Sequence, residues 1–391
     1  MKMGIEELDK GICTITYRLF VAVKVVIRVI FVLLNNVYCI PTYCVWMLML
    51  LPLRKLYPPL YWKMEGLFFH WLLAMVTMWS WTAGYDLVEV GDDIRVCLDD
   101  RTLVVVNHQS TSDVPMLMAN FNARRNVLPN IMWIMDWIFK LTNFGIVSII
   151  HQDFFILSGK KQRDKGVKEL RAHLRESYIP RKRKLMVLFP EGGFLRKRRE
   201  TSQKYAMKNN LPVLNYVTLP RLGAFHAIID ELTPLPVTKY GSGKEETNTY
   251  EDSALVSLLT EDKSADKLSW VLDITIAYPG GVPLDLPTII MGYRRACKTY
   301  LCYRLYPASQ VPRDHETMTK WLFDRWAEKE RMLETFYQTG EFPYQMYCSS
   351  EKPLGPQLVH QDFLRFFILH VFFIASSCAH YWIFVQLWSL I

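Results

Sequence analysis

A histidine and an aspartate five residues apart, His108 and Asp113, are the first pair in the sequence with the means for acid–base chemistry. They belong to residues 107–113 (NHQSTSD), between a strand-like apolar run and a helix-like segment. A five-residue offset across such a turn lets the carboxylate fold back onto the imidazole and leave the other ring nitrogen to take a proton. The spacing alone has low specificity, because about half a match is expected by chance in a chain of this composition. An aspartate that caps the helix beside an unconnected histidine is the plain alternative.

A second group of chemically useful residues is the segment 189–193 (FPEGG), which follows another apolar run. Its adjacent glycines, Gly192 and Gly193, allow the backbone to approach a ligand closely. The carboxylate of Glu191 can order a hydroxyl or a cationic side chain, and the basic run that starts at Arg196 can bind phosphate. The plain alternatives are a tight turn and a solvated basic face. No nucleotide-binding loop of the G-x-x-x-x-G-K type is present.

These blocks resemble those of a known enzyme family. Residues 107–113 look like the N-H-x-x-x-x-D block of glycerophospholipid acyltransferases, the 1-acylglycerol-phosphate acyltransferase family, and residues 189–192 resemble its F-P-E-G block. Residues 217–223 (VTLPRLG) resemble a further block that ends in L-P-R, and the three occur in the family's order. Residues 142–156 and 189–203 are similar in particular to members that acylate lysophosphatidylglycerol.

The resemblance implies transfer of a fatty acyl group from acyl-CoA to a free glycerol hydroxyl of a lysophospholipid during phospholipid remodelling. Lysophosphatidylglycerol and lysophosphatidylethanolamine are the favoured acceptors. His108 would be the general base and Asp113 would orient it. Because a thioester is already activated, we expect no metal, no cofactor and no covalent nucleophile, with acyl-CoA as a co-substrate. The residues expected to contact substrate or the oxyanion are Gln109, Glu191, Gly192, Gly193, Arg196 and Arg221.

Other functions stay open. An acyl-CoA thioesterase would use water in place of the acceptor, and a non-catalytic lipid-binding membrane scaffold would keep the fold without the chemistry. The intact histidine–aspartate and glutamate–glycine pairs argue against the scaffold. A nucleophilic role for Ser110 or Ser112 is disfavoured, because the chain has no G-x-S-x-G elbow.

Short apolar runs alternate with helix-like stretches between the two ends of the chain, which predicts an α/β fold: an acyltransferase-like mixed sheet covered by helices. The expected strands are 102–107, 145–150, 185–189, 214–219, 271–277 and 298–305. The expected helices are 112–122, 132–141, 163–178 and 316–337, the last capped by Gly340. The expected parts are an N-terminal membrane-embedded helical region (1–85), the α/β domain (86–362) with a polar insertion at 240–267, and a C-terminal transmembrane helix (363–391).

The composition indicates membrane association. Apolar and aromatic residues make up 51% of the 391 residues against 21% charged ones, which excludes a disordered chain, and 14% are aromatic. Residues 67–85 carry no formal charge and are long enough to cross a bilayer, as are residues 366–391 behind Arg365. Residues 29–53 are apolar but interrupted by Pro41, so they span with a kink or lie at the interface. A helix buried in the protein core is the alternative for each segment.

The basic residues are concentrated in one segment. The net charge is +8, but residues 158–204 hold sixteen Lys and Arg against five Asp and Glu, a local excess of 16 − 5 = +11 around Glu191. We therefore expect anionic partners, acyl-CoA and lysophospholipid, together with the lipid bilayer, and no nucleic acid. Because acyl-CoA is made mainly on the cytosolic side, we expect an endoplasmic reticulum membrane protein with a cytosolic catalytic domain.

Overall fold

The computed structural model describes residues 2–157, 159, 162–233 and 267–390. Within this part of the chain, eight strands form a single mixed sheet in the order β4-β3-β5-β2-β6-β7-β1-β8. The strands are β1 (Tyr85–Gly91), β2 (Thr102–Val106), β3 (Ile131–Asp136), β4 (Phe154–Ile156), β5 (Leu185–Leu188), β6 (Trp270–Ala277), β7 (Cys297–Pro307) and β8 (Leu354–Leu358). The helices are α1 (Lys2–Met49), α2 (Leu51–Leu56), α3 (Pro58–Trp81), α4 (Asp113–Asn122), α5 (Asn143–His151), α6 (Arg163–His173), α7 (Leu195–Lys208), α8 (Leu222–Leu232), α10 (Leu286–Met291), α11 (His315–Thr339) and α12 (Phe363–Trp388). The predicted α/β fold with a mixed sheet is confirmed.

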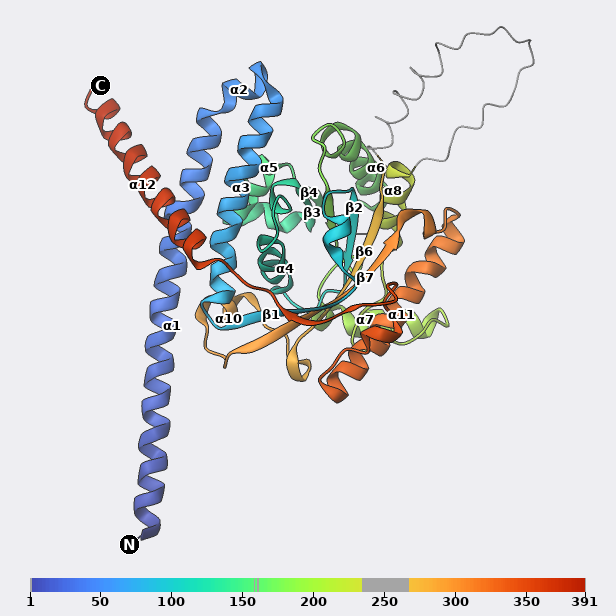
Figure 1. The fold of residues 1–391 in the computed structure, drawn as a ribbon, viewed down its shortest axis with the longest axis horizontal. Helices are drawn as coiled ribbons and strands as arrows, with labels where there is room; N and C mark the ends of the chain where they lie inside the picture. Colours follow the sequence, from blue (N-terminus) through green and yellow to red (C-terminus); the bar gives the residue numbers. More distant parts are fainter. Residues whose placement is uncertain (1, 158, 160–161, 234–266, 391) are drawn as a thin grey trace, which may run out of the picture.

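Helices cover both faces of the sheet, and β2 illustrates why. All five of its residues are buried, and the four apolar ones alternate between two cores. Val104 and Val106 join the core formed with α3 and α4, whereas Leu103 and Val105 join the core formed with α6, α8 and α11. A strand buried on both faces is the arrangement that a continuous Val and Leu run predicts. Figure 1 shows the sheet at the centre, with α3 and α4 on one side and α11 on the other.

The five neighbouring strands from β4, at one edge of the sheet, to β6 are parallel to one another. β2 is parallel to β5 and to β6, β3 is parallel to β4 and β5, and β1 is parallel to β7. The β6–β7 and β1–β8 pairs are antiparallel. The loops that follow β2, β5 and β6 therefore all leave from the carboxyl ends of these strands, where ligands of α/β proteins commonly bind.

Three of the predicted elements differ in the structure. Residues 145–150 form most of α5 and not a strand, because a short apolar run has the same appearance in a buried strand and in a helix. Residues 132–141 form β3 followed by a 3-10 turn, Trp137–Leu141, and not a helix. Residues 214–219 have no strand partner, and the N–H groups of residues 215–217 donate to the Glu330 carboxylate of α11 instead.

The remaining predicted elements are present. They include β2, β5, β6, β7, α4, α6 and α11, and Gly340 ends α11 with a left-handed φ of 83°. A π-helical turn, Leu174–Tyr178, continues α6. The predicted insertion at 240–267 lies outside the described residues apart from Lys267.

The helices at the two ends of the chain differ in burial. Within the described residues, α12 is the one helix long and apolar enough to cross a membrane, and only 11% of its most apolar window is buried in the protein. Helix α3 contains most of the predicted span 67–85, yet it packs into the core and fifteen of its residues are buried. The structure therefore matches the core-helix alternative for α3. Helix α1 runs unbroken through Pro41 and contacts both α3 and α12, and its apolar side chains from Leu19 to Val37 include many exposed ones (Figure 1).

Candidate active site

The two motif segments are neighbours because β2 and β5 are adjacent parallel strands. Residues 102–105 pair with 185–188, so both loops begin at the same edge of the sheet. Asn107 extends this arrangement towards β6. Its side-chain amide donates to the Ile276 carbonyl at 3.1 Å, and its Oδ1 accepts the Ile276 N–H at 2.8 Å. The asparagine side chain thus replaces a backbone pair where β2 ends, and it fixes the loop that follows.

The His108 imidazole contacts the Asp113 carboxylate, as the five-residue spacing predicts. His108 Nδ1 lies 2.8 Å from Asp113 Oδ2. The same oxygen accepts the backbone N–H of Gln109 at 2.6 Å and that of Ser110 at 2.9 Å. The Asp113 side chain is fully buried, whereas 14% of the His108 side chain is exposed. The loop is therefore wound around the carboxylate, and the histidine is the member of the pair that faces outwards.

The contact also determines which nitrogen of His108 can act. A carboxylate only accepts hydrogen bonds, so Nδ1 bears the hydrogen and Nε2 keeps its lone pair. Within the described residues, Nε2 has no hydrogen-bond partner. The ring stacks on Phe189, with centroids 4.3 Å apart, and meets the edge of Phe194 at 5.4 Å. This arrangement holds the ring in one tautomer and leaves Nε2 able to accept a proton.

The opposite oxygen of Asp113 accepts a hydrogen bond from the buried side chain of Tyr278. The Tyr278 hydroxyl lies 2.6 Å from Asp113 Oδ1, and it also lies 2.8 Å from the Ser112 hydroxyl. The Ser112 hydroxyl in turn donates to the Leu284 carbonyl at 2.7 Å. Burial and the adjacent carboxylate raise the pKa of Tyr278 well above its usual value, so it stays a hydroxyl donor. Asp113 thus accepts four hydrogen bonds, three at Oδ2 and one at Oδ1.

Glu191 lies behind the histidine. It is 2% exposed, and its Oε1 accepts the His108 backbone N–H at 3.1 Å, while Trp326 Nε1 of α11 lies 3.4 Å from the same oxygen. Its Oε2 accepts the N–H of Thr218 at 3.1 Å and the Thr218 hydroxyl at 2.9 Å. Burial raises the pKa of Glu191 to about 7, opposed by the hydrogen bonds from Thr218 and His108. The carboxyl group therefore joins three loops and α11, and the substrate contact expected from the sequence stays a prediction.

The two glycines after Glu191 allow arginine side chains to pack over the turn. Gly192 has a φ of +66° and Gly193 a φ of +153°, both in the region that side chains rarely adopt. A Cβ at Gly192 would lie 2.9 Å from Cζ of Arg221, and one at Gly193 would lie 2.8 Å from Nε of Arg198. Arg198 also donates to the Gly192 carbonyl at 3.0 Å. The close approach that the glycines permit here is made by two guanidinium groups of the protein.

The other predicted contact residues divide into a buried one and an exposed one. Gln109 is buried. Its side-chain amide donates to the Tyr216 carbonyl at 2.7 Å, and its backbone N–H donates to the Asp113 carboxylate. The structure thus gives both groups a partner other than an oxyanion. Arg196 is exposed in the first turn of α7. The structure brings together His108, Gln109, Asp113, Glu191, Gly192 and Arg221, and it leaves Arg196 at the rim.

Comparison with known proteins identifies the chain's relatives. Residues 88–237 match the family described as "Acyltransferase", and residues 290–363 match "Acyltransferase C-terminus". Acyl-CoA:lysophosphatidylglycerol acyltransferase 1 of Mus musculus is 44% identical over 324 residues, which cover 83% of this chain and 84% of the relative. The Homo sapiens protein of that name is 44% identical over 321 residues, or 82% and 84% of the two chains. The chain belongs to the acyltransferase family.

A solved structure with this family's name is more distant. The acyltransferase PlsC from Thermotoga maritima covers 78% of this chain, and 99% of the PlsC chain is covered, at 12% identity and a TM-score of 0.33. That similarity is too low to support an argument about individual residues here.

Tyr278 is the residue of this site that the sequence motifs missed, and it also lies outside the ranges matched by the family models. His108, Asp113, Glu191 and Arg221 all fall inside the matched range 88–237. Tyr278 falls between the two matched ranges, after β6, and no motif marks it. Only its position at the end of a strand next to β2 could have indicated that it reaches the acyltransferase site. Among the described residues, no group of three or more His, Cys, Asp or Glu side chains could hold a metal ion.

Proposed function

We propose that this acyltransferase moves a fatty acyl group from acyl-CoA to a free glycerol hydroxyl of a lysophospholipid, with lysophosphatidylglycerol or lysophosphatidylethanolamine as the acceptor. The observation that supports the chemistry best is the contact of 2.8 Å between His108 Nδ1 and Asp113 Oδ2, with Nε2 unengaged among the described residues. The acceptor assignment is supported by the relatives that are 44% identical and named for lysophosphatidylglycerol.

In the proposed reaction, His108 Nε2 takes the proton of the acceptor hydroxyl as its oxygen attacks the thioester carbonyl. The Asp113 carboxylate stabilises the imidazolium that forms, because it lies against the protonated Nδ1. The tetrahedral oxyanion then collapses, the carbon–sulfur bond breaks, and the CoA thiolate leaves with the proton from Nε2. Each proton and electron pair is accounted for without a metal or a cofactor, and acyl-CoA is a co-substrate.

The anionic parts of both substrates meet cationic groups close to this histidine. Arg221 packs over Gly192, and α7 begins one turn further on with Arg196 exposed. Arg221 is therefore the phosphate-binding arginine of the proposal, and Arg196 is placed to contact a more exposed phosphate of either substrate. Glu191 holds the loops that position these groups.

The proposal also places the protein in a membrane, that of the endoplasmic reticulum, with the α/β domain on the cytosolic side. It is supported by α12, whose apolar surface is mostly uncovered, and by the exposed apolar side chains of α1. A lysophospholipid substrate lies in a bilayer, and acyl-CoA is made mainly on the cytosolic side. Protease accessibility of residues 158–204 in sealed microsomes tests the orientation, and full protection of that segment would contradict it.

Purified full-length protein supplied with one acyl-CoA and a panel of lysophospholipids tests the activity, with products identified by mass spectrometry. His108→Ala should lower acyl transfer by ~10²–10⁴-fold, because the general base is lost. His315→Ala is the matched control, since this imidazole is largely exposed on α11. Wild-type transfer by folded His108→Ala protein would refute the mechanism. Free fatty acid as the sole product, formed equally without lysophospholipid, would indicate a thioesterase, and equal use of every headgroup would remove the acceptor assignment.

A further inference from the structure

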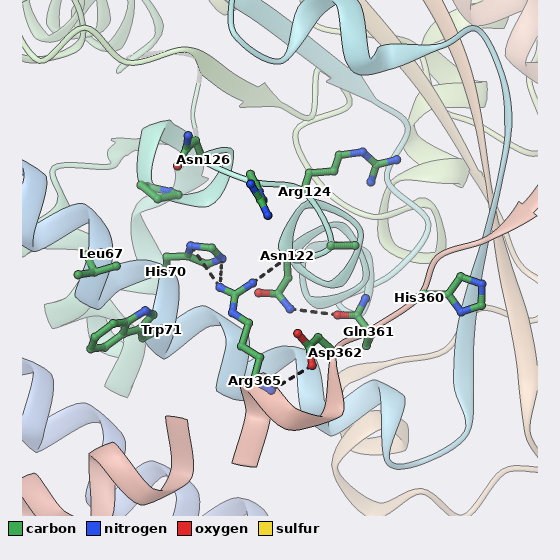
Figure 2. A pocket seen from close by; sticks show the side chains of 13 residues that line it. Leu67, His70, Trp71, Asn122, Arg124, Asn126, His360, Gln361, Asp362 and Arg365 are labelled. Carbon is green, nitrogen blue, oxygen red and sulfur yellow. Dashed lines mark hydrogen bonds between the residues drawn. The ribbon is translucent and has the colours of Figure 1, made fainter. Parts of the chain in front are cut away.

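A polar cavity lies at the end of α4 away from His108. Its volume is about 440 Å³, and α3, the segment after α4 and the start of α12 enclose it (Figure 2). Helix α4 begins at Asp113 and ends at Asn122, which lines the cavity. At 1.5 Å per residue, the helix separates the two places by about 15 Å. The cavity is therefore distinct from the site at His108.

One half-buried cation of this cavity is Arg365, in the first turn of α12. Its Nη2 lies 2.5 Å from His70 Nε2, and its Nη1 donates to the Asn122 carbonyl at 3.3 Å. Figure 2 shows the guanidinium pointing between His70 and Asn122. Burial and the neighbouring arginine lower the pKa of His70 to about 4, so the imidazole is a neutral acceptor at neutral pH. Both partners orient the guanidinium and neither neutralises its charge.

The cavity as a whole has an excess of positive charge. Arg124 is paired with Glu89, but within the described residues neither Arg125 nor Arg365 forms an ion pair with a carboxylate. Asp362 is the single carboxylate among the lining residues, and it accepts the backbone N–H of Arg365 as the cap of α12. A half-buried guanidinium without a counter-ion is a strong site for a phosphate oxygen.

The position of Arg365 indicates the source of that phosphate. It stands where α12 begins, and residues 366–391 carry no charged side chain, so the guanidinium lies at the headgroup level of a bilayer that α12 crosses. Leu67 and Trp71 of α3 line the same cavity and offer apolar and aromatic contact to the glycerol and the first acyl carbons. The cavity thus has a polar wall and an apolar wall, which match the polar headgroup and the apolar acyl chains of a phospholipid.

We infer that this cavity binds the phosphate of a bilayer phospholipid, at a site separate from the acyl acceptor. The inference rests on the membrane placement of α12 that is proposed above. A lipid held here would join α3, α4 and α12, and so fix the α/β domain against the helix that enters the membrane. It requires no chemistry at the cavity, and it is independent of acyl transfer at His108.

Native mass spectrometry of the full-length protein, titrated with dioleoylphosphatidylglycerol in detergent, tests this inference. One lipid should bind the wild type, and Arg365→Gln should weaken that binding about tenfold or more, because a charge-assisted hydrogen bond is lost. Arg125→Gln should weaken it about threefold without touching the contacts of Arg365. Arg331→Gln, an exposed arginine of α11, is the matched control and should bind as the wild type does.

Two competitors identify the ligand and the site. Inorganic phosphate should displace the lipid only at a far higher concentration, and stoichiometric lysophosphatidylglycerol should leave it bound. Equal affinity for phosphate and for lipid, or displacement by stoichiometric lysophosphatidylglycerol, would overturn the inference, as would unchanged lipid binding in both Arg365→Gln and Arg125→Gln. His108→Ala should lose acyl transfer and keep the lipid, so failure of this inference and failure of the proposed function give different results.

Discussion

Replacing Tyr278 by phenylalanine removes a single hydroxyl group, the one that contacts the Asp113 carboxylate behind the proposed base, His108. That hydroxyl donates to Asp113 Oδ1 at 2.6 Å and contacts the Ser112 hydroxyl at 2.8 Å, in a fully buried environment. The ring itself remains, so the packing of the core changes little. What changes is that one oxygen of the Asp113 carboxylate loses its donor.

The size of the effect follows from the charge on the acceptor. A hydrogen bond to a charged group contributes about 1.5–3 kcal/mol, and a buried oxygen without a donor retains its desolvation penalty. If this contribution serves to hold Asp113 against His108 in the transition state, kcat/KM for acyl transfer should fall about 10- to 100-fold. Thermal stability should fall as well, because the same bond stabilises the folded protein.

A second buried tyrosine separates the two effects. The Tyr303 hydroxyl lies 2.8 Å from Asn120 Oδ1 and 3.1 Å from Glu89 Oε2, and the side chain is 2% exposed. Tyr303→Phe therefore removes a buried hydroxyl group whose partners, Asn120 and Glu89, do not contact His108. We expect both variants to lose similar thermal stability in detergent and only Tyr278→Phe to lose kcat/KM, measured as CoA release with lysophosphatidylglycerol. Equal kcat/KM in the two variants would refute a role for Tyr278 in positioning the base.

Two more variants test the neighbouring loop. Burial raises the pKa of Glu191 from an ordinary 4.5 to about 7, so the folded protein binds this proton more tightly than the unfolded chain, and stability should fall by up to about 3 kcal/mol as pH rises from 4.5 through 7. Glu191→Gln should lack that component in thermal unfolding across this pH range. Gly192→Ala should raise KM for the lysophospholipid several-fold, because the new Cβ would lie 2.9 Å from Cζ of Arg221 and displace the guanidinium.

Each of these variants has a result that would contradict its reasoning. For Glu191→Gln, a pH dependence identical to that of the wild type would show that another group titrates. For Gly192→Ala, the control is Gly340→Ala, which has a φ of +83° and no atom within 4 Å of the added Cβ. Both substitutions place alanine in a left-handed conformation at a cost of about 1 kcal/mol. An equal effect of the two on KM would mean that backbone strain, and not Arg221, is responsible.

The sequence by itself determined the local part of this site. The His108–Asp113 contact lies within one loop, so a spacing of five residues and the adjoining strand and helix were enough to predict it. The strands β2, β5, β6 and β7 were predictable for a related reason, because continuous apolar runs need burial on both faces. The α5 segment shows the limit of that pattern, since a six-residue apolar run fits a helix equally well.

Only the tertiary structure decided which distant residues meet that loop. Tyr278 is 165 residues from Asp113 along the chain, and it reaches the carboxylate because β6 pairs with β2. Glu191 belongs to a motif, yet its burial against Thr218 and Trp326, which ties the loops together, follows only from the packed structure. Strand order and burial are properties of the packed sheet, and local sequence patterns do not encode them.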